Sequence, residues 1–119
     1  MILQVVPKVF YEKLEDALDL WERALGFKVV HRDPQMAVVE REGAKLYLLE
    51  APEYAKLDRP EIALIVDTID DLHRELTINA PNLLHPNLKM VEERPWGARE
   101  FAVLDRTGVC IVFRQWPQK

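Results

Sequence analysis

Cysteine is almost missing from this chain, because Cys110 is the only one among 119 residues. A single thiol excludes an intramolecular disulfide and any zinc site built from several cysteines. No apolar run approaches the roughly 18 residues that span a bilayer. The N-terminal sequence MILQVVPKVF lacks the basic start and long apolar core of a signal peptide. We therefore expect a soluble, cytoplasmic protein without a membrane partner.

The chain also lacks an excess of basic charge. Sixteen Lys and Arg residues face twenty Asp and Glu residues, which gives a formal net charge of -4. Proteins that bind nucleic acid usually carry a basic stripe, so we expect no nucleic-acid partner. The composition is 49% hydrophobic and 30% charged, which is typical of a folded globular chain. The length predicts a single domain over residues 1–119.

The first half contains one helical pattern among several strand patterns. Apolar residues at i, i+4, i+7 and i+11 predict a helix over Glu12–Leu25, with Gly26 as its left-handed end. Trp21 lies on the apolar stripe and is predicted to belong to the core. Pro7 indicates an edge, a bulge or a crossing point between subunits. The predicted strands are Ile2–Phe10, Phe27–Arg32, Met36–Arg41 and Ala44–Glu50.

The second half repeats this order after a polar segment, Ala51–Pro60, that reads as a linker. Thr68 is predicted to cap the second helix, with Asp71 at the capping-box position. The predicted elements are a strand over 61–67, a helix over 69–76, a loop over 79–87, and strands over 89–93, 99–104 and 109–114. A tight turn over 105–108 joins the last two. The repeats therefore cover about 1–52 and 61–119, joined by about 52–60, and predict an α+β fold of two βαβββ units.

Two segments carry a resemblance to a known family. They are LWERALGFKVV, over Leu20–Val30, and RPWGAREFAVLDRTGVCIVF, over Arg94–Phe113. With the repeated element order, they resemble the vicinal oxygen chelate superfamily, which groups glyoxalases, bleomycin-resistance proteins and dioxygenases. The Val-Pro of the first strand and the Pro-Trp-Gly before Arg-Glu-Phe are most similar to the bleomycin-resistance proteins. The resemblance implies curled mixed sheets around a groove, and a dimer.

Enzymes of that superfamily hold a divalent metal with His, Gln or Glu on inward-facing strand positions. Here the corresponding positions are Val6, Tyr47, Glu61 and Val112. Only Glu61 among them can ligate a metal, and one carboxylate does not hold a catalytic ion. The histidines do not form a ligand spacing either: they are His31, His73 and His85. We therefore expect no metal and no cofactor, and we favour a protein that is not an enzyme.

The resemblance then implies antibiotic resistance by ligand sequestration in a groove at a homodimer interface, with strand exchange around Pro7. Trp96 matches a groove tryptophan that stacks on flat drug groups, or else it packs under Gly97 and stabilises a hairpin. A net-acidic groove would favour a cationic ligand, with charge from Glu40, Glu61 and Glu100. The predicted ligand contacts are Trp96, Glu61, Tyr47, Met36, His31, Arg99 and Arg114.

The face on which each of these side chains lies follows from strand alternation. Arg99 and Phe101 share one strand face, and Glu100 points to the other. Arg99 is either a groove donor or a surface ion-pair partner.

Two other functions stay open. In the first, Glu61 is a general base whose pKa is raised by enclosure among Ala63, Tyr47 and Val112, as in a metal-free lyase, or an enzyme uses metal ligands at other positions. In the second, the chain is an interaction module whose groove is filled by its own side chains.

Overall fold

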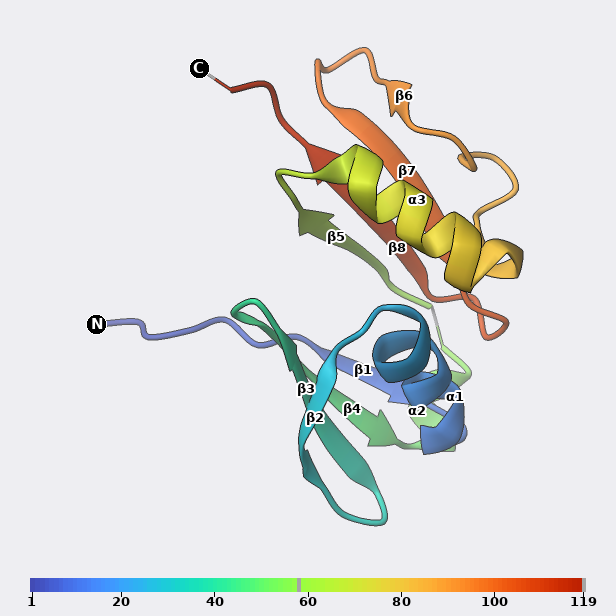
Figure 1. Ribbon diagram of the computed structural model, residues 1–119. Coiled ribbons are helices and arrows are strands. Elements are labelled where there is room, and N and C mark those ends of the chain that lie inside the picture. Colours follow the sequence, from blue (N-terminus) through green and yellow to red (C-terminus); the bar gives the residue numbers. More distant parts are fainter. Residues whose placement is uncertain (58, 119) are drawn as a thin grey trace. The chain divides into compact units, whose positions relative to one another are not determined.

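A computed structural model, which describes residues 1–57 and 59–118, forms two compact units, Met1–Asp58 and Arg59–Lys119 (Figure 1). Each unit contains one four-stranded mixed sheet, with strand orders β1-β4-β3-β2 and β5-β8-β7-β6. The two orders are equivalent, because the first strand of each unit pairs in parallel with the fourth. This confirms the predicted α+β class and the repeated topology. In the part of the chain described, no helix is long and apolar enough to cross a membrane.

The first sheet consists of β1 (Lys8–Tyr11), β2 (Lys28–Arg32), β3 (Met36–Arg41) and β4 (Ala44–Glu50). The bounds of β3 and β4 are those predicted. The predicted start of the first strand at Ile2 is wrong, because β1 begins only after Pro7. Proline has no backbone N–H to donate to the sheet, which favours a strand boundary there.

The helical part of the first unit differs in form from the prediction. It consists of α1 (Leu14–Leu18) and a π-helical continuation, η1 (Asp19–Ala24). The wider π turn still places Leu20 and Trp21 in the core. Gly26 follows with φ +72°, the left-handed conformation expected at a helix end.

Trp21 is fully buried, which confirms its predicted place in the core. Its Nε1 donates a hydrogen bond to the hydroxyl of Tyr11, 3.2 Å away, and Tyr11 is also fully buried. Phe27 meets the Trp21 ring edge-on, with ring centroids 5.2 Å apart. In the core of this unit, this hydrogen bond links the helix to the edge strand β1.

The second unit contains β5 (Glu61–Ile65), α3 (Ile69–Asn79), β6 (Glu92–Glu93), β7 (Arg99–Leu104) and β8 (Cys110–Gln115). The bounds of β7 are those predicted, and the turn between β7 and β8 closes with Gly108 N–H donating to Asp105 O at 3.1 Å. The strand predicted over 89–93 is limited to the two residues of β6, which pair with Arg99 and Glu100.

Three further expectations for the second half are corrected. The linker contains a short helix, α2 (Pro52–Ala55), which Pro52 begins. The loop over 79–87 contains a 3-10 helix, η2 (Pro81–Leu83). The Thr68 side chain does not cap α3; instead, the Ile69 N–H donates to Gln115 Oε1 at 2.8 Å, and Asp71 pairs with Arg74.

The helix α3 covers one face of the second sheet (Figure 1). Phe101 and Phe113 stack on this face at 4.7 Å, and His73 of α3 meets Phe101 edge-on at 5.0 Å. Alternation along the strands assigns every other residue to the opposite face. We call it the helix-free face; the residues of β5, β7 and β8 on it are Glu61, Ala63, Ile65, Glu100, Ala102, Leu104, Cys110, Val112 and Arg114.

The hydroxyl of Tyr11 accepts the hydrogen bond of the buried Trp21 indole, so its removal should lower the stability of the first unit. Tyr11→Phe leaves the buried Trp21 Nε1 without this acceptor, so we expect the free energy of unfolding to fall by about 1–3 kcal/mol. Tyr54→Phe removes the same group from an exposed ring and is expected to change it by less than about 0.5 kcal/mol. Urea denaturation followed by circular dichroism measures both. Equal effects of the two variants would contradict the assigned role.

Candidate functional site

A tight turn between β6 and β7 brings Trp96 to the second sheet. The Gly97 N–H donates to Arg94 O at 2.9 Å, and the Arg94 N–H donates to Ala98 O at 2.8 Å. Gly97 has φ +95°, which residues with a side chain rarely adopt, so the Pro-Trp-Gly sequence suits this turn. Trp96 Nε1 donates to Glu100 Oε2 at 2.8 Å, while the residue stays 50% exposed. The indole is thus fixed at its nitrogen while half of the residue stays exposed.

Glu100 is the buried acid of this region, with only 4% of its side chain exposed. Its Oε2 also accepts a hydrogen bond from Arg114 Nε at 2.5 Å, across the β7–β8 pair. Its Oε1 lies 3.9 Å from Arg94 Nε. A carboxylate away from water is stable only when it is paired and hydrogen-bonded, and these groups supply that pairing.

Arg94 completes the group by packing against the indole. Its guanidinium carbon lies 5.1 Å from the Trp96 ring centroid, within the range of a cation–π contact. One of its terminal nitrogens donates to Glu92 Oε2 at 3.2 Å. We refer to Arg94, Trp96, Glu100 and Arg114 as the Trp96 cluster. It combines an aromatic surface with two guanidinium groups around one carboxylate.

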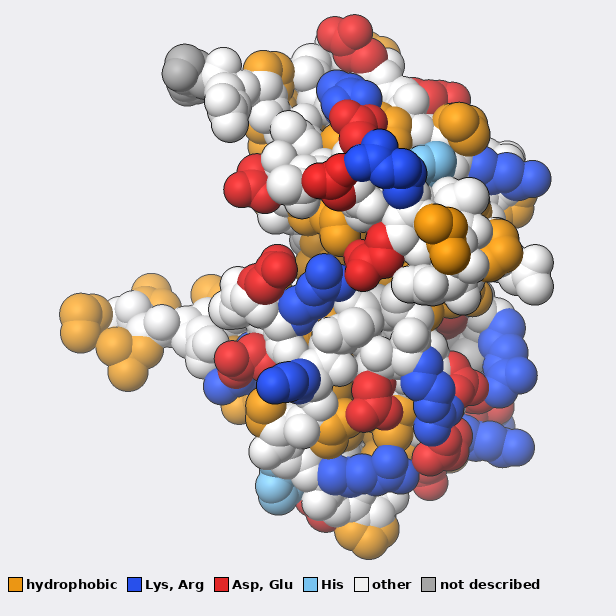
Figure 2. All heavy atoms as spheres, viewed as in Figure 1, with side chains coloured by type: hydrophobic (Ala, Val, Ile, Leu, Met, Phe, Trp, Pro, Cys, Tyr) orange, Lys and Arg blue, Asp and Glu red, His pale blue; other side chains and the backbone are white. Residues whose placement is uncertain are grey.

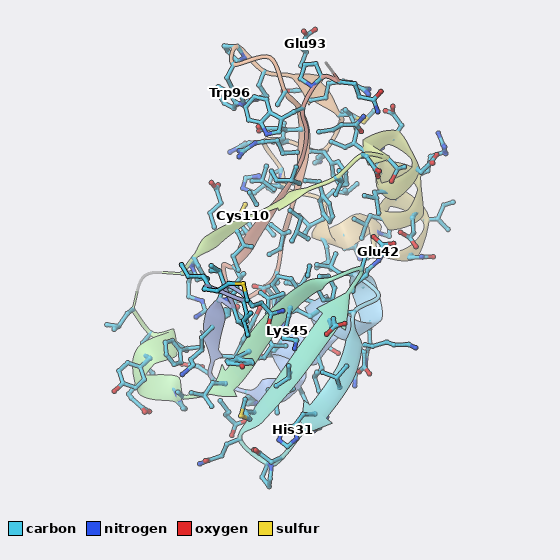
Figure 3. All side chains as sticks on the ribbon, turned by 90° about the vertical axis from the view of Figure 1, so that its left-hand side faces the viewer. His31, Glu42, Lys45, Glu93, Trp96 and Cys110 are labelled. Carbon is cyan, nitrogen blue, oxygen red and sulfur yellow. The ribbon has the colours of Figure 1, made fainter. Side chains whose placement is uncertain are left out.

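Glu61 and Cys110 form the other end of the helix-free face. They pair across β5 and β8, whereas Ile65 pairs with Arg114. Ile65 lies four residues after Glu61 on β5. At about 3.3 Å per residue, the distance along the strand from Glu61 to the position that pairs with Arg114 is therefore about 13 Å. Figure 3 shows Trp96 and Cys110 toward opposite ends of the sheet. Burial raises the pKa of the Cys110 thiol, and the charge and hydrogen bond of Glu61 raise it further.

The enclosure expected around Glu61 is not observed, because this residue is exposed at the start of β5. A desolvated carboxyl group was the basis for treating Glu61 as a general base. The structure therefore gives that alternative no support from burial. It leaves Glu61 as an accessible negative charge on the helix-free face.

Arg99 lies on the other face of the second sheet from the Trp96 cluster. It shares that face with Phe101, as predicted, and its two terminal nitrogens donate to the Asp70 carboxylate of α3 at 2.9 and 2.8 Å. The hydrogen bonds from Arg99 lower the pKa of Asp70, and the carboxylate raises the pKa of Arg99 in turn. Of the two roles considered for Arg99, the ion pair is the one observed.

The remaining predicted contacts belong to the first sheet. Met36 on β3 and Tyr47 on β4 share the face opposite α1 and are half-buried. His31 on β2 is exposed, with Nε2 3.5 Å from Asp33 Oδ2. Glu40 lies 3.8 Å from Lys45, so its charge is partly compensated. The structure thus groups Glu61, Trp96 and Arg114 on one sheet, and Met36, Tyr47 and His31 on the other.

Sequence reasoning missed Arg94 and the burial of Glu100. Glu100 was expected to supply negative charge to a groove, and that expectation is wrong because its side chain is buried and paired. Its Oε2 accepts hydrogen bonds from Trp96 and Arg114, and its Oε1 lies 3.9 Å from Arg94 Nε. The pairing of Glu100 with Arg114 follows from the strand register once the β7–β8 turn is known. No comparable signal marks Arg94, which reaches the carboxylate through the fold of the turn. Among the described residues, no three His, Cys, Asp or Glu side chains are grouped to hold a metal.

Comparison with known proteins gives a consistent result. A family model described as the Glyoxalase/Bleomycin resistance protein/Dioxygenase superfamily matches residues 2–113. Bleomycin resistance proteins of Geobacillus stearothermophilus and Staphylococcus aureus are each 24% identical over 96% of this chain and 97% of theirs.

Solved structures show the same likeness in the fold. A crystal structure of a bleomycin-binding protein complexed with bleomycin has a TM-score of 0.79, with 20% identity over 98% of this chain and 100% of that one. The bleomycin-binding protein of bleomycin-producing Streptomyces verticillus, complexed with copper(II)-bleomycin, has a TM-score of 0.77, with 26% identity over 99% and 98%.

The buried carboxylate makes a clear prediction for stability. Arg114→Ala leaves Glu100 without its closest cationic partner, so we expect the free energy of unfolding to fall by about 3 kcal/mol. Arg99→Ala removes a guanidinium from the adjacent strand but breaks only an exposed pair, and should have a much smaller effect. Chemical denaturation of both variants tests this. Similar losses for the two would show that the carboxylate does not depend on Arg114.

Proposed function

Because the chain belongs to the Glyoxalase/Bleomycin resistance protein/Dioxygenase superfamily, we propose that it is a small-molecule-binding protein of the bleomycin-resistance type. It sequesters a flat ligand without turnover, and no metal takes part. The observation that carries this proposal is Trp96, which is half-exposed while its nitrogen is held by Glu100. A fixed aromatic surface loses little conformational freedom on binding and accepts flat rings without one required hydrogen-bond pattern.

The helix-free face extends the contact beyond the indole. Between the Trp96 cluster and Glu61 it carries small or apolar side chains, including Ala63, Ala102 and Val112. Ala102 and Val112 are buried, whereas Ala63 and Ile65 on β5 are exposed. The two exposed residues offer an apolar path about 13 Å long from the level of Arg114 to Glu61. Glu61 at its far end is an exposed carboxylate that suits a positively charged group of the ligand. A ligand with a flat ring and a distant cationic group fits this arrangement.

We propose further that two copies of the chain form a homodimer, with ligand grooves at the interface. The support comes from the N-terminal segment, where Met1, Ile2, Leu3 and Val5 are each at least 84% exposed. Figure 2 shows hydrophobic side chains gathered on the projecting N-terminal segment, which leads to the edge strand β1. Exposed apolar side chains in a row favour association, and exchange of this segment around Pro7 would cover them. Met36, Tyr47 and His31 are proposed to contribute ligand contacts from the first sheet.

Binding can be tested with metal-free bleomycin on the metal-stripped protein. We expect saturable quenching of tryptophan fluorescence near one ligand per chain, and loss of this response in Trp96→Ala. Trp116→Phe is the matched control, since it removes another exposed indole and should keep the response. The absence of quenching up to high micromolar drug would refute a ligand of the bleomycin type. Quenching that survives in Trp96→Ala would refute the assigned site.

The dimer is tested by light scattering after size exclusion. We expect a mass of twice the 13.9 kDa chain at micromolar concentration. A triple variant, Ile2→Ser, Leu3→Ser and Val5→Ser, removes the apolar surface of the N-terminal segment and should shift the mass toward the single chain. A wild-type protein that elutes as a monomer, or a variant that stays dimeric, would contradict the role of this segment.

A further inference from the structure

We propose that the Trp96 cluster selects a ligand whose flat ring carries an anionic oxygen, such as a carboxylate. This inference rests on the proposed function and names the ligand chemistry at one end of the same face. The acidic composition of the chain predicts a cationic ligand, whereas at the Trp96 end of the helix-free face we infer an anionic group on the ligand. The reason is that Glu100, the buried acid of this region, is already paired with Arg94 and Arg114.

The charges of the cluster do not cancel. Glu100 contributes one carboxylate, with 4% of its side chain exposed, whereas Arg94 and Arg114 contribute two guanidinium groups. The exposed Glu92 binds Arg94 from the rim. Arg94 is 32% exposed, but its charge is paired with that of the exposed Glu92. The positive charge without an exposed acidic partner is therefore that of Arg114, whose side chain is 25% exposed.

Arg114 still has donors to offer. Its Nε makes the contact with Glu100, and within the described chain its two terminal nitrogens have no hydrogen-bond partner. A guanidinium held at Nε presents these nitrogens as a fixed fork, which matches the two oxygens of a carboxylate. Trp96 and Arg114 donate to the same oxygen of Glu100, so the indole and the fork lie side by side. One ligand can therefore stack on the first and bind the second.

The contact between Arg94 and Trp96 acts against a cationic ring. The Arg94 guanidinium already lies over the indole, 5.1 Å from the ring centroid, and makes a cation–π contact with it. A second positive charge stacked on the same indole would be repelled by Arg94. A neutral ring with an anionic substituent meets no such repulsion. The cationic group suited to Glu61 would then belong to a separate part of the ligand, about 13 Å along the sheet.

Three bicyclic probes of nearly equal shape test the inference: quinoline-2-carboxylate, quinoline-2-carboxamide and 2-(aminomethyl)quinoline. Binding is followed by the indole N–H resonance of Trp96 in the ¹⁵N-labelled protein, assigned with Trp96→Phe. We expect the carboxylate to bind about ten-fold more tightly than the amine, with the carboxamide between them.

Two variants, one that removes the positive charge of Arg114 and one that removes the negative charge of Glu100, distinguish the contributions of these residues to ligand preference. Arg114→Gln should remove the preference for the carboxylate and leave carboxamide binding nearly unchanged. Glu100→Gln keeps the shape of the side chain, removes its negative charge and should strengthen the preference. Arg74→Gln, on the exposed surface of α3, is the control for a general charge effect and should change nothing.

The outcomes distinguish the inference from the proposed function. Amine binding equal to or tighter than carboxylate binding, or an Arg114→Gln variant with an unchanged preference, would overturn the inference alone. If none of the probes shifts the Trp96 resonance, the proposed ligand site itself is refuted. The dispersion of the remaining resonances reports whether Arg114→Gln is folded. If it is not, Glu100→Gln alone decides, because an unchanged preference in that variant also overturns the inference.

Discussion

The buried carboxylate of Glu100 is the constraint on which the second unit depends. Its charge must be paired, since an unpaired charge in a sheet interior is strongly unfavourable. The groups that pair with it come from different parts of the chain: Trp96 and Arg94 from the turn before β7, and Arg114 from β8. One side chain thus links the turn, its own strand and the last strand. The position of the indole is a consequence of that link.

This arrangement joins two interpretations of Trp96 that the sequence presented as alternatives. As a hairpin residue, the indole donates to Glu100 and packs on Arg94. As a binding surface, it keeps half of its area exposed. The contacts that stabilise the turn are made by the ring nitrogen and by the part of the ring that packs on Arg94. They leave the exposed part of the indole available for a ligand. Stabilising the turn and holding an aromatic surface ready for a ligand are the same interaction here.

Local chemistry made part of the fold predictable. The Glu42-Gly43 turn has positive φ at both residues, and it fixes the ends of β3 and β4 that were predicted correctly. The alternation of Arg99, Glu100 and Phe101 likewise gave the correct faces. What could not be predicted depends on distant partners: the Gln115 oxygen replaces the expected Thr68 cap, and the donors around Glu100 become visible only when β7 and β8 are paired. The presence of a glutamate at position 100 does not by itself indicate that its charge is paired with Arg94 and Arg114.

The surroundings of Cys110 have a practical consequence for solution studies. A thiol whose pKa is raised by burial and by a nearby carboxylate exists mostly in its protonated form at neutral pH. Thiolates are the reactive species toward maleimides and similar reagents, so this cysteine is a slow target. A second cysteine introduced on an exposed loop would react first, and a single spectroscopic label could be attached there without removing the native residue. Pairs of such labels, one in each unit, would measure how the two sheets are arranged in solution.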